Sequence, residues 1–200
     1  MNVRRQHDLD SDSPQRLALV PPLKVVEVLR PRPGQRFLDV ACGTGTFFFP
    51  VFESMLGKGV FLAAEWDEER LRRFLTRLES YVEHPGYTRM EVVRTKPERL
   101  PLPDRCADLV LMAQAYHNLA DRAAYLLELK RLLAPGGTLC LLDWHPAAED
   151  PASAGKKTLG PDHSARVSEQ QAVRDLSAAG FRWLVAHAGF AQHWCLTGRV

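Results

Sequence analysis

Two glycines stand in a short turn between an apolar strand and an apolar helix, where a ligand could lie against the backbone. The run Phe37–Val40, interrupted only by the acid Asp39, predicts a buried parallel strand, and Ala41–Gly45 follows as a turn of small residues. Gly43 and Gly45 permit close approach because a Cβ there would block the ligand or forbid the backbone angles. The helix that comes next would present its N-terminal N–H groups to the same place. This stretch therefore predicts a cofactor site.

The spacing of the glycines bears on the kind of cofactor. A dinucleotide-binding fingerprint, G-x-G-x-x-G, would require a third glycine at position 48, where the chain has Phe48. The acid Asp39 inside the strand is also unlike that fingerprint. A nicotinamide-dependent oxidoreductase therefore stays only as a rival hypothesis.

An acid at the end of the second predicted strand is suited to bind a ribose. Val60–Ala64 predicts that strand, and Glu65 ends it, 22 positions after Gly43. A carboxylate in this place can accept hydrogen bonds from both hydroxyls of an adenosine ribose. Trp66, next in the chain, would pack on the adenine or else fill the corner between the strand and the helix that starts at Asp67.

Polar aromatic side chains follow the fourth and fifth predicted strands. Tyr116 and His117 come after the run 106–112, and His145 comes after 138–142. Open α/β sheets bind their ligands at the carboxyl ends of the strands, so Tyr116 and His117 are expected to contact a substrate. His117 is the first candidate for a general base and His145 the second. A purely structural role within the loop is the alternative for both histidines.

These motifs resemble those of class I S-adenosylmethionine-dependent methyltransferases, with small bacterial enzymes of the quinone-biosynthesis type as the nearest resemblance. Leu38–Gly45 is similar to their first motif, with Ala41 in place of the first glycine. Leu132–Gly137 resembles the Leu-x-Pro-Gly-Gly turn common before their fifth strand. The acid that binds the adenine amino group in that family falls on Lys96 here. Either Glu98 or a backbone carbonyl would take its place, or adenine would be held by packing alone.

The resemblance implies S-adenosylmethionine as the cofactor and a set of binding residues along one edge of the sheet. Gly43 and Gly45 would let the backbone approach the methionine part, while Asp39 would orient that turn or meet the ammonium group. Glu65 would hold the ribose. The cofactor-binding residues implied in full are Asp39, Ala41, Gly43, Gly45, Glu65, Trp66, Glu98 and Gln114.

The implied fold is α/β, a Rossmann-like three-layer αβα sandwich whose seven-stranded, mostly parallel sheet ends in an antiparallel C-terminal hairpin. The link between the predicted strands 181–187 and 192–197 is too short for a crossover helix, which independently favours a hairpin. Two hundred residues suit a single domain over 1–200. Within it, residues 1–14 are expected to form a flexible arm and residues 146–166 a mobile lid loop.

Composition and charge argue against several classes of protein. The net charge of +2 does not favour nucleic acid as a partner. The four cysteines are scattered without a CxxC pair, so neither a disulfide framework nor a metal site is expected. No apolar run approaches the ~20 residues needed to span a membrane. We expect a cytoplasmic monomer or homodimer that acts on a small molecule.

The resemblance implies methyl transfer from S-adenosylmethionine to a small or medium-sized acceptor, through an oxygen, nitrogen or carbon nucleophile. Such chemistry depends on alignment of the nucleophile with the methyl group and on exclusion of water more than on covalent help. A non-catalytic subunit that binds the cofactor as a regulator or partner is the alternative. The departure at Lys96 would fit it, and it would tolerate loss of His117 and His145.

Overall fold

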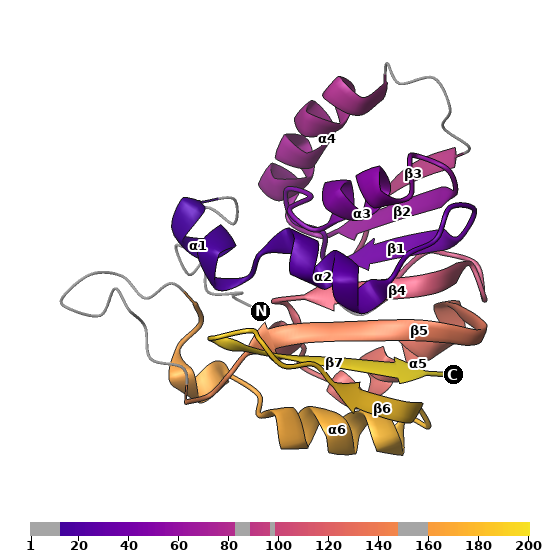
Figure 1. The fold of residues 1–200 in the computed structure, drawn as a ribbon. Helices are drawn as coiled ribbons and strands as arrows, with labels where there is room; N and C mark the ends of the chain where they lie inside the picture. Colours follow the sequence, from indigo (N-terminus) through magenta and orange to yellow (C-terminus); the bar gives the residue numbers. More distant parts are fainter. Residues whose placement is uncertain (1–12, 83–88, 97–98, 148–159) are drawn as a thin grey trace.

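One sheet of seven strands organises the part of the chain that the computed structural model describes, which is residues 13–82, 89–96, 99–147 and 160–200. The strand order is β3-β2-β1-β4-β5-β7-β6 (Figure 1). Neighbours are parallel from β3 through β5, whereas β7 runs antiparallel to both β5 and β6. The predicted mostly parallel sheet with an antiparallel C-terminal hairpin is confirmed.

Helices alternate with the strands along the chain. The strands are β1 (Arg36–Val40), β2 (Val60–Glu65), β3 (Arg89–Arg94), β4 (Ala107–Ala113), β5 (Leu133–Trp144), β6 (Arg182–Ala186) and β7 (His193–Arg199). The α-helices are α1 (Pro14–Leu19), α2 (Pro22–Leu29), α3 (Phe48–Ser54), α4 (Glu68–Val82), α5 (Arg122–Leu132) and α6 (Glu169–Ala178). Two 3₁₀ turns are η1 (Tyr116–Asn118) and η2 (His163–Ala165).

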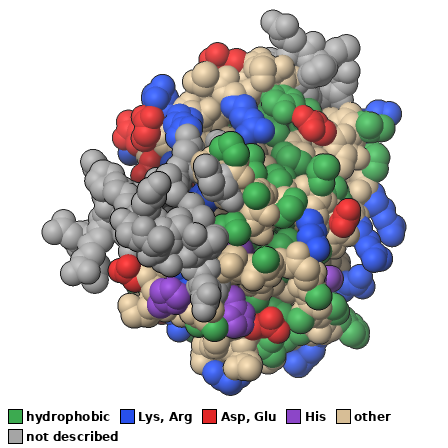
Figure 2. Space-filling view, turned by 60° about the vertical axis from the view of Figure 1, so that its left-hand side comes forward, with side chains coloured by type: hydrophobic (Ala, Val, Ile, Leu, Met, Phe, Trp, Pro, Cys, Tyr) green, Lys and Arg blue, Asp and Glu red, His purple; other side chains and the backbone are tan. Residues whose placement is uncertain are grey.

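The surface carries charges of both signs. On the face shown in Figure 2, basic and acidic side chains are interspersed rather than gathered into one basic stripe. None of the helices described is long and apolar enough to cross a membrane. Among the described residues there is also no group of three or more His, Cys, Asp or Glu side chains that could hold a metal ion.

One face of the sheet is covered by α2, α3 and α4, which lie together in front of the strands in Figure 1. Strand side chains alternate between the two faces, so Phe37 of β1 and Phe61 of β2 point to this one. They pack with Phe48 and Phe49 of α3 and with Phe74 of α4. The rings of Phe48 and Phe74 meet edge to face, with centroids 5.1 Å apart. This aromatic cluster fixes α3, and with it the turn that precedes α3.

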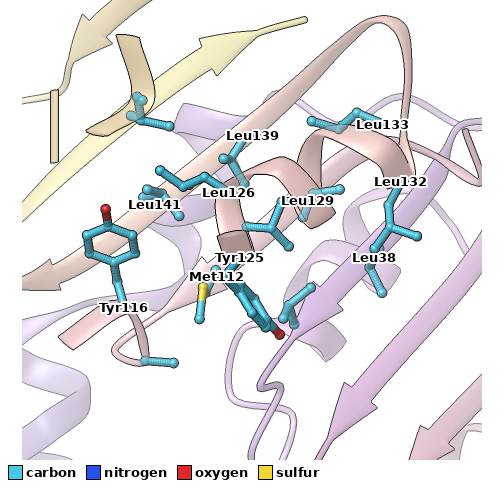
Figure 3. Close-up of a cluster of buried hydrophobic side chains, with 14 of the residues drawn as sticks. Leu38, Met112, Tyr116, Tyr125, Leu126, Leu129, Leu132, Leu133, Leu139 and Leu141 are labelled. Carbon is cyan, nitrogen blue, oxygen red and sulfur yellow. The ribbon is translucent and has the colours of Figure 1, made fainter. Parts of the chain in front are cut away.

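The opposite face is covered by α5, whose leucines Figure 3 shows, and by α6, which adds Ala172 and Leu176 to the same buried cluster. Leu38 of β1 and Met112 of β4 point to it, and they share one buried cluster with Leu126 and Leu129 of α5. Side chains that alternate between two covered faces explain why the inner strands are apolar almost throughout. The three layers place the carboxyl ends of β1, β2, β4 and β5 along one edge of the sheet, and α1 lies beside that edge in Figure 1.

Side-chain caps fix the starts of two helices. Asp121 accepts a hydrogen bond of 2.9 Å from the Ala124 N–H at the start of α5, and Ser168 accepts one of 3.2 Å from the Gln171 N–H at the start of α6. Ser168 and Gln171 do not form a reciprocal capping box, because the Gln171 side chain donates to Asp175 instead.

The two segments expected to be mobile are described only in part. Residues 1–12 of the predicted arm lie outside the described residues, and the arm stays a prediction. Its last residue, Pro14, already starts α1 under a cap from Ser13. Residues 148–159 of the predicted lid also lie outside the description. Its last part is anchored, since Arg166 Nε donates to the Pro161 carbonyl over 3.0 Å.

Candidate active site

The turn after β1 has the left-handed backbone that its small residues allow. The φ angles are 57° at Ala41, 59° at Gly43 and 85° at Gly45. A Cβ at Gly43 would meet no heavy atom within 4 Å, so this glycine faces open space. A Cβ at Gly45 would instead collide with the ring of Phe49, so this glycine is needed for packing. Only Gly43 therefore leaves room that a ligand could use.

Glu65 braces this turn with its buried carboxylate. The Gly43 N–H donates to Glu65 Oε2 over 2.7 Å, and the Trp66 and Asp67 N–H groups donate to Oε1 over 2.8 Å each. The link between Gly43 and Glu65 joins the ends of β1 and β2, and the sequence did not predict it. A carboxylate has about four acceptor positions, so three protein bonds leave about one for a ribose hydroxyl. Binding of the ribose by Glu65 stays a prediction, and the carboxylate has fewer free acceptor positions for the two hydroxyls than we expected.

Asp39 supplies an acceptor oxygen that no donor among the described residues uses. It is buried in β1, and its Oδ2 atom has no hydrogen-bond partner. Burial first, and the nearby charge of Glu65 second, raise the pKa of Asp39 well above its ordinary value of 3.8. A buried carboxylate without a partner is costly, and a cationic or N–H-bearing ligand would relieve it. The orphaned oxygen and the room at Gly43 together fit the ammonium-bearing end of S-adenosylmethionine.

Asp39→Asn is expected to stabilise the protein and to weaken cofactor binding. Between the ordinary and the raised pKa of Asp39, the folded protein keeps a proton that the unfolded chain has released, so wild-type stability falls as pH rises through that window. Asparagine does not titrate, and the variant should gain about 1–3 kcal/mol in free energy of unfolding at neutral pH. Its affinity for S-adenosylhomocysteine should drop about tenfold or more. Urea unfolding measures the stability, and calorimetric titration measures the affinity. The difference in free energy of unfolding between Asp39→Asn and the wild type should widen from about pH 4.5 to 7.5, and a constant difference would contradict the raised pKa of Asp39.

The structure does not bring together a complete set of residues that could bind adenine. Trp66 is half-buried and packs against the core on the α5 side of the sheet. Lys96 is exposed, and its backbone carbonyl accepts a hydrogen bond of 3.1 Å from the Thr95 hydroxyl. Glu98 lies outside the described residues. How adenine would be held therefore stays a prediction.

Gln114 follows the last residue of β4 and has a φ of 55°, a left-handed angle that costs a non-glycine residue strain. Its side chain is engaged on both sides. The amide oxygen accepts a hydrogen bond of 2.6 Å from Arg16 of α1, and the amide nitrogen lies 2.9 Å from His193 Nε2. These contacts turn Gln114 toward α1 and β7, so its predicted contact with the cofactor has no support from the geometry.

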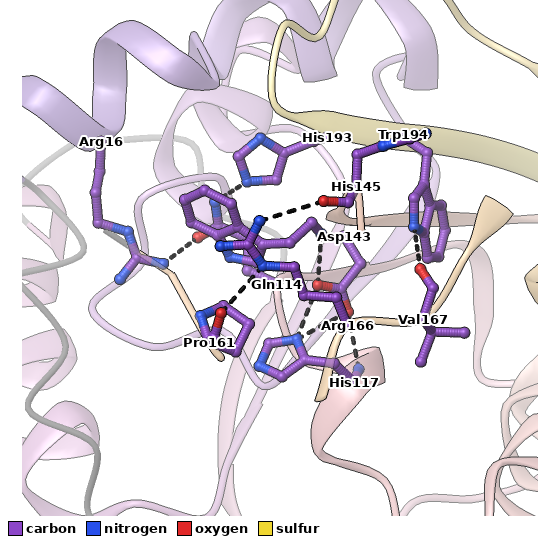
Figure 4. A network of polar contacts seen from close by, with 11 residues as sticks. Arg16, Gln114, His117, Asp143, His145, Pro161, Arg166, Val167, His193 and Trp194 are labelled. Carbon is purple, nitrogen blue, oxygen red and sulfur yellow. Dashed lines mark hydrogen bonds and ion pairs between the residues drawn. The ribbon is translucent and has the colours of Figure 1, made fainter. Parts of the chain in front are cut away.

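His117 and Asp143 form a buried pair where β4 and β5 end (Figure 4). His117 Nδ1 lies 2.8 Å from Asp143 Oδ1, and the His117 main-chain N–H donates to Oδ2 over 2.9 Å. Trp144 N–H donates to Oδ1 over 2.7 Å. The side chain of Asp143 is 0% exposed and that of His117 is 8% exposed. A carboxylate so fixed holds the imidazole in one orientation, with Nε2 as the acceptor nitrogen.

Asp143 is the site residue that the sequence analysis missed. An acid at the end of a strand was the signal that singled out Glu65 after β2, and Asp143 carries the same signal near the end of β5. Its partner could not be recognised, because His117 and Asp143 are 26 positions apart and nothing in the sequence indicates that the two meet.

The predicted catalytic role of Tyr116 has no support from the geometry and stays a prediction. Its side chain is fully buried, its hydroxyl donates to Asp175 of α6 over 2.7 Å, and its ring packs edge to face on Trp194. Burial first, and the hydrogen bond to Asp175 second, raise its pKa. The helical turn η1 sends Tyr116 into the core and His117 toward the sheet edge. Tyr116 is thus next to His117 in the sequence, but its side chain packs in the core.

His145 is exposed just beyond β5. Its Nδ1 accepts a hydrogen bond of 3.2 Å from the Ala147 N–H, and its backbone carbonyl accepts one of 3.3 Å from Arg166. These contacts are those of a residue that shapes its own loop. Its role as the second candidate base stays a prediction.

The strand order, the glycine turn after β1 and the buried acids at the ends of β1 and β2 define a class I S-adenosylmethionine-dependent methyltransferase. Residues 38–141 match the methyltransferase domain family. A match over more than half of the 200 residues shows the family, and the chain belongs to it.

Relatives and solved structures agree with this class. The ubiquinone/menaquinone biosynthesis C-methyltransferase of Shewanella frigidimarina is 31% identical over 121 residues, which are 60% of this chain and 46% of that protein. The chain thus spans less than half the length of the curated relatives it matches. An S-adenosylmethionine-dependent methyltransferase from Aquifex aeolicus has a TM-score of 0.81 at 26% identity, with 94% of each chain covered.

A more distant structure shares the fold alone. It is an N-methyltransferase of Haemonchus contortus, solved with phosphomonomethylethanolamine and S-adenosylhomocysteine. Its TM-score is 0.67 at 15% identity, over 83% of this chain and 38% of that one.

Proposed function

We propose that this protein transfers a methyl group from S-adenosylmethionine to a small-molecule acceptor, with His117 as the general base. The observation that carries the proposal is the 2.8 Å hydrogen bond between His117 Nδ1 and the buried Asp143, on the sheet edge that also holds the glycine turn. With its hydrogen on Nδ1, the imidazole offers Nε2 to the proton of a hydroxyl, an amine or an acidic C–H group. Asp143 then stabilises the imidazolium that forms.

The other residues of the proposed site bind the cofactor and align it with the acceptor. Bound S-adenosylmethionine supplies a methyl group on a sulfonium that is already a good leaving group. The protein therefore has to hold the acceptor in line and keep water out. In this proposal Gly43 leaves room beside the turn, Asp39 accepts hydrogen bonds from the ammonium group, and Glu65 braces the turn while it receives a ribose hydroxyl.

A small molecule is the proposed partner. The interspersed surface charges of Figure 2 and the net charge of +2 support it over a nucleic acid. The relatives' name specifies methylation at carbon on a quinone pathway, but the chain covers only 46% of their length, so we do not carry their acceptor over. A cytoplasmic monomer or homodimer completes the proposal, and the free thiols of all four cysteines suit a reducing compartment.

Calorimetric titration with S-adenosylhomocysteine, with NAD and NADP as controls, tests the cofactor. We expect micromolar binding of the first and none of the others. Absence of binding to S-adenosylhomocysteine would refute the proposed function, and binding of NAD instead would favour the oxidoreductase hypothesis. Release of S-adenosylhomocysteine from S-adenosylmethionine in the presence of phenols, amines and acidic carbon compounds then tests catalysis. Binding without turnover on every acceptor would favour the non-catalytic subunit.

A further inference from the structure

The 3₁₀ turn η1, which carries His117, is held from two sides by carboxylates of other elements. On one side Asp143 of β5 accepts from the His117 main-chain N–H and bonds to the imidazole. On the other side Asp175 of α6 accepts a hydrogen bond of 2.7 Å from the hydroxyl of Tyr116. Tyr116 and His117 are consecutive residues of this turn, so whatever fixes the Tyr116 side chain also fixes the backbone from which the imidazole extends.

Asp175 is itself held in place by donors from two helices. Gln171 of α6 donates to its Oδ1 atom over 2.7 Å, and Arg122 of α5 donates to its Oδ2 atom over 3.3 Å. Burial acts to raise the pKa of Asp175, but the hydrogen bonds from Tyr116, Gln171 and Arg122 outweigh it and bring that pKa below its ordinary value of 3.8. The carboxylate is therefore charged at neutral pH, and its hydrogen bond from Tyr116 is a charge-assisted one.

The ring of Tyr116 is confined as well as its hydroxyl. It is fully buried and meets the indole of Trp194 edge to face, with ring centroids 6.1 Å apart. Trp194 in turn donates from Nε1 to the Val167 carbonyl over 2.7 Å (Figure 4). The guanidinium carbon of Arg122 lies 5.9 Å from the centre of the Tyr116 ring. A side chain fixed both at its ring and at its tip leaves η1 little freedom to rotate.

The proposed base depends on the orientation of this turn. The imidazole of His117 bonds to Asp143 over 2.8 Å through Nδ1, so a rotation of η1 would change both this bond and the direction of Nε2. A displacement of about 1 Å in a reacting group can lower a rate about 100-fold. Whatever holds η1 in place therefore contributes to catalysis without contacting the substrate.

We propose that Tyr116 and Asp175 are positioning residues for the base, because their hydrogen bond ties η1 to α6 and so keeps His117 in register with Asp143. This inference rests on the proposed function, since it assigns how the same site keeps its base in place. Both residues act through His117, and neither touches the acceptor or the cofactor in this proposal.

A double-mutant cycle tests whether Tyr116 acts through His117. Tyr116→Phe removes the hydroxyl and keeps the ring, and it should lower kcat about tenfold or more, with little change in the KM of the acceptor. In the His117→Gln background the same substitution should not lower kcat further, because no base is left to position. An equal loss of kcat in both backgrounds would show a purely structural role and overturn the inference.

The partner of the bond and a matched control make the cycle specific. Asp175→Ala should reproduce the loss of kcat. Asp175→Asn should keep most of the rate, because its amide oxygen can still accept from the Tyr116 hydroxyl. Tyr81→Phe is the control, since the Tyr81 hydroxyl donates to Glu53 over the same 2.7 Å between the helices on the other face of the sheet. It should leave kcat unchanged, and a loss equal to that of Tyr116→Phe would overturn the inference.

An NMR measurement tests the positioning without turnover. In the wild-type protein the proton on His117 Nδ1, which bonds to Asp143, should give its own imidazole N–H resonance. Tyr116→Phe and Asp175→Ala should shift or broaden this resonance, and Tyr81→Phe should leave it in place. An unchanged resonance in Tyr116→Phe would contradict the positioning. Circular dichroism checks that each variant is folded.

The outcomes separate this inference from the proposed function. Protein that binds S-adenosylhomocysteine and needs His117, but loses the same factor in kcat in both backgrounds of the cycle, retains the proposed function and loses the positioning. Protein without affinity for S-adenosylhomocysteine refutes the proposed function, and the imidazole resonance then still decides whether Tyr116 and Asp175 hold His117 in place.

Discussion

His117→Gln is expected to lower kcat by about 10²- to 10⁴-fold, the usual contribution of a positioned general base. Glutamine can keep a hydrogen bond to Asp143, but it cannot take a proton from the acceptor. Affinity for S-adenosylhomocysteine should stay the same, because the imidazole bonds to Asp143 and not to the glycine turn. The measurement is the initial rate of S-adenosylhomocysteine formation, with the acceptor from the screen at saturation.

Companion variants keep this test specific. Asp143→Asn should also lower kcat, because the amide no longer dictates which imidazole nitrogen carries the hydrogen and cannot stabilise the imidazolium. His187→Gln is the control, since His187 of the β6–β7 hairpin contacts Thr197 and not the site. A large loss in His145→Gln with normal rates in His117→Gln would move the base to His145. Normal rates in both would show that the transfer needs no base.

Gly43→Val is expected to abolish binding of S-adenosylhomocysteine, which corresponds to a loss of at least about 100-fold, or about 3 kcal/mol. The valine side chain would fill the open space that Gly43 leaves beside the turn. The left-handed φ of 59° also strains a residue with a Cβ, at a cost of about 1–2 kcal/mol. A typical domain has about 5–15 kcal/mol of stability and can absorb that cost. Calorimetric titration measures the binding, and circular dichroism checks the fold.

Gly136→Val is the matched control for this strain. Gly136 also has a left-handed φ, of 76°, and a Cβ there would also meet no heavy atom within 4 Å. It lies near the start of β5, at the edge of the sheet opposite to the glycine turn. Both variants should therefore lose similar stability, while only Gly43→Val loses the ligand. Full binding by a folded Gly43→Val protein would remove the glycine turn from the site.

The two experiments examine separate parts of the proposal. Gly43 concerns the room for the cofactor, and His117 concerns the proton of the acceptor. A protein that depends on Gly43 but not on His117 would be a methyltransferase whose acceptor is already ionised, or a binding subunit. The acceptor screen tells these two apart, because only the first gives turnover.

The strands, their order along the chain and the turn that binds the cofactor in our proposal could all be predicted from the amino-acid sequence. Runs such as Phe37–Val40 and Val60–Glu65 are apolar because both of their faces are covered, and this is visible in a few consecutive residues. The small residues 41–45 report a backbone that larger side chains would not adopt. Caps at Asp121 and Ser168 are equally local. Local chemistry of this kind can be read without knowing what lies next to it.

Which side chains meet could not be predicted in this way, because it depends on the three-dimensional fold. The Asp143 carboxylate bonds to His117, the base in our proposal, and Arg16 reaches Gln114 across 98 positions of sequence. Tyr116 looked like a site residue because it follows β4, yet the turn of η1 sends it into the core against Asp175 and Trp194. Such contacts depend on strand order, register and the direction of a single turn of helix. Strand order, register and the direction of that turn cannot be predicted from residue types and spacing, because the packing of the whole sheet sets them.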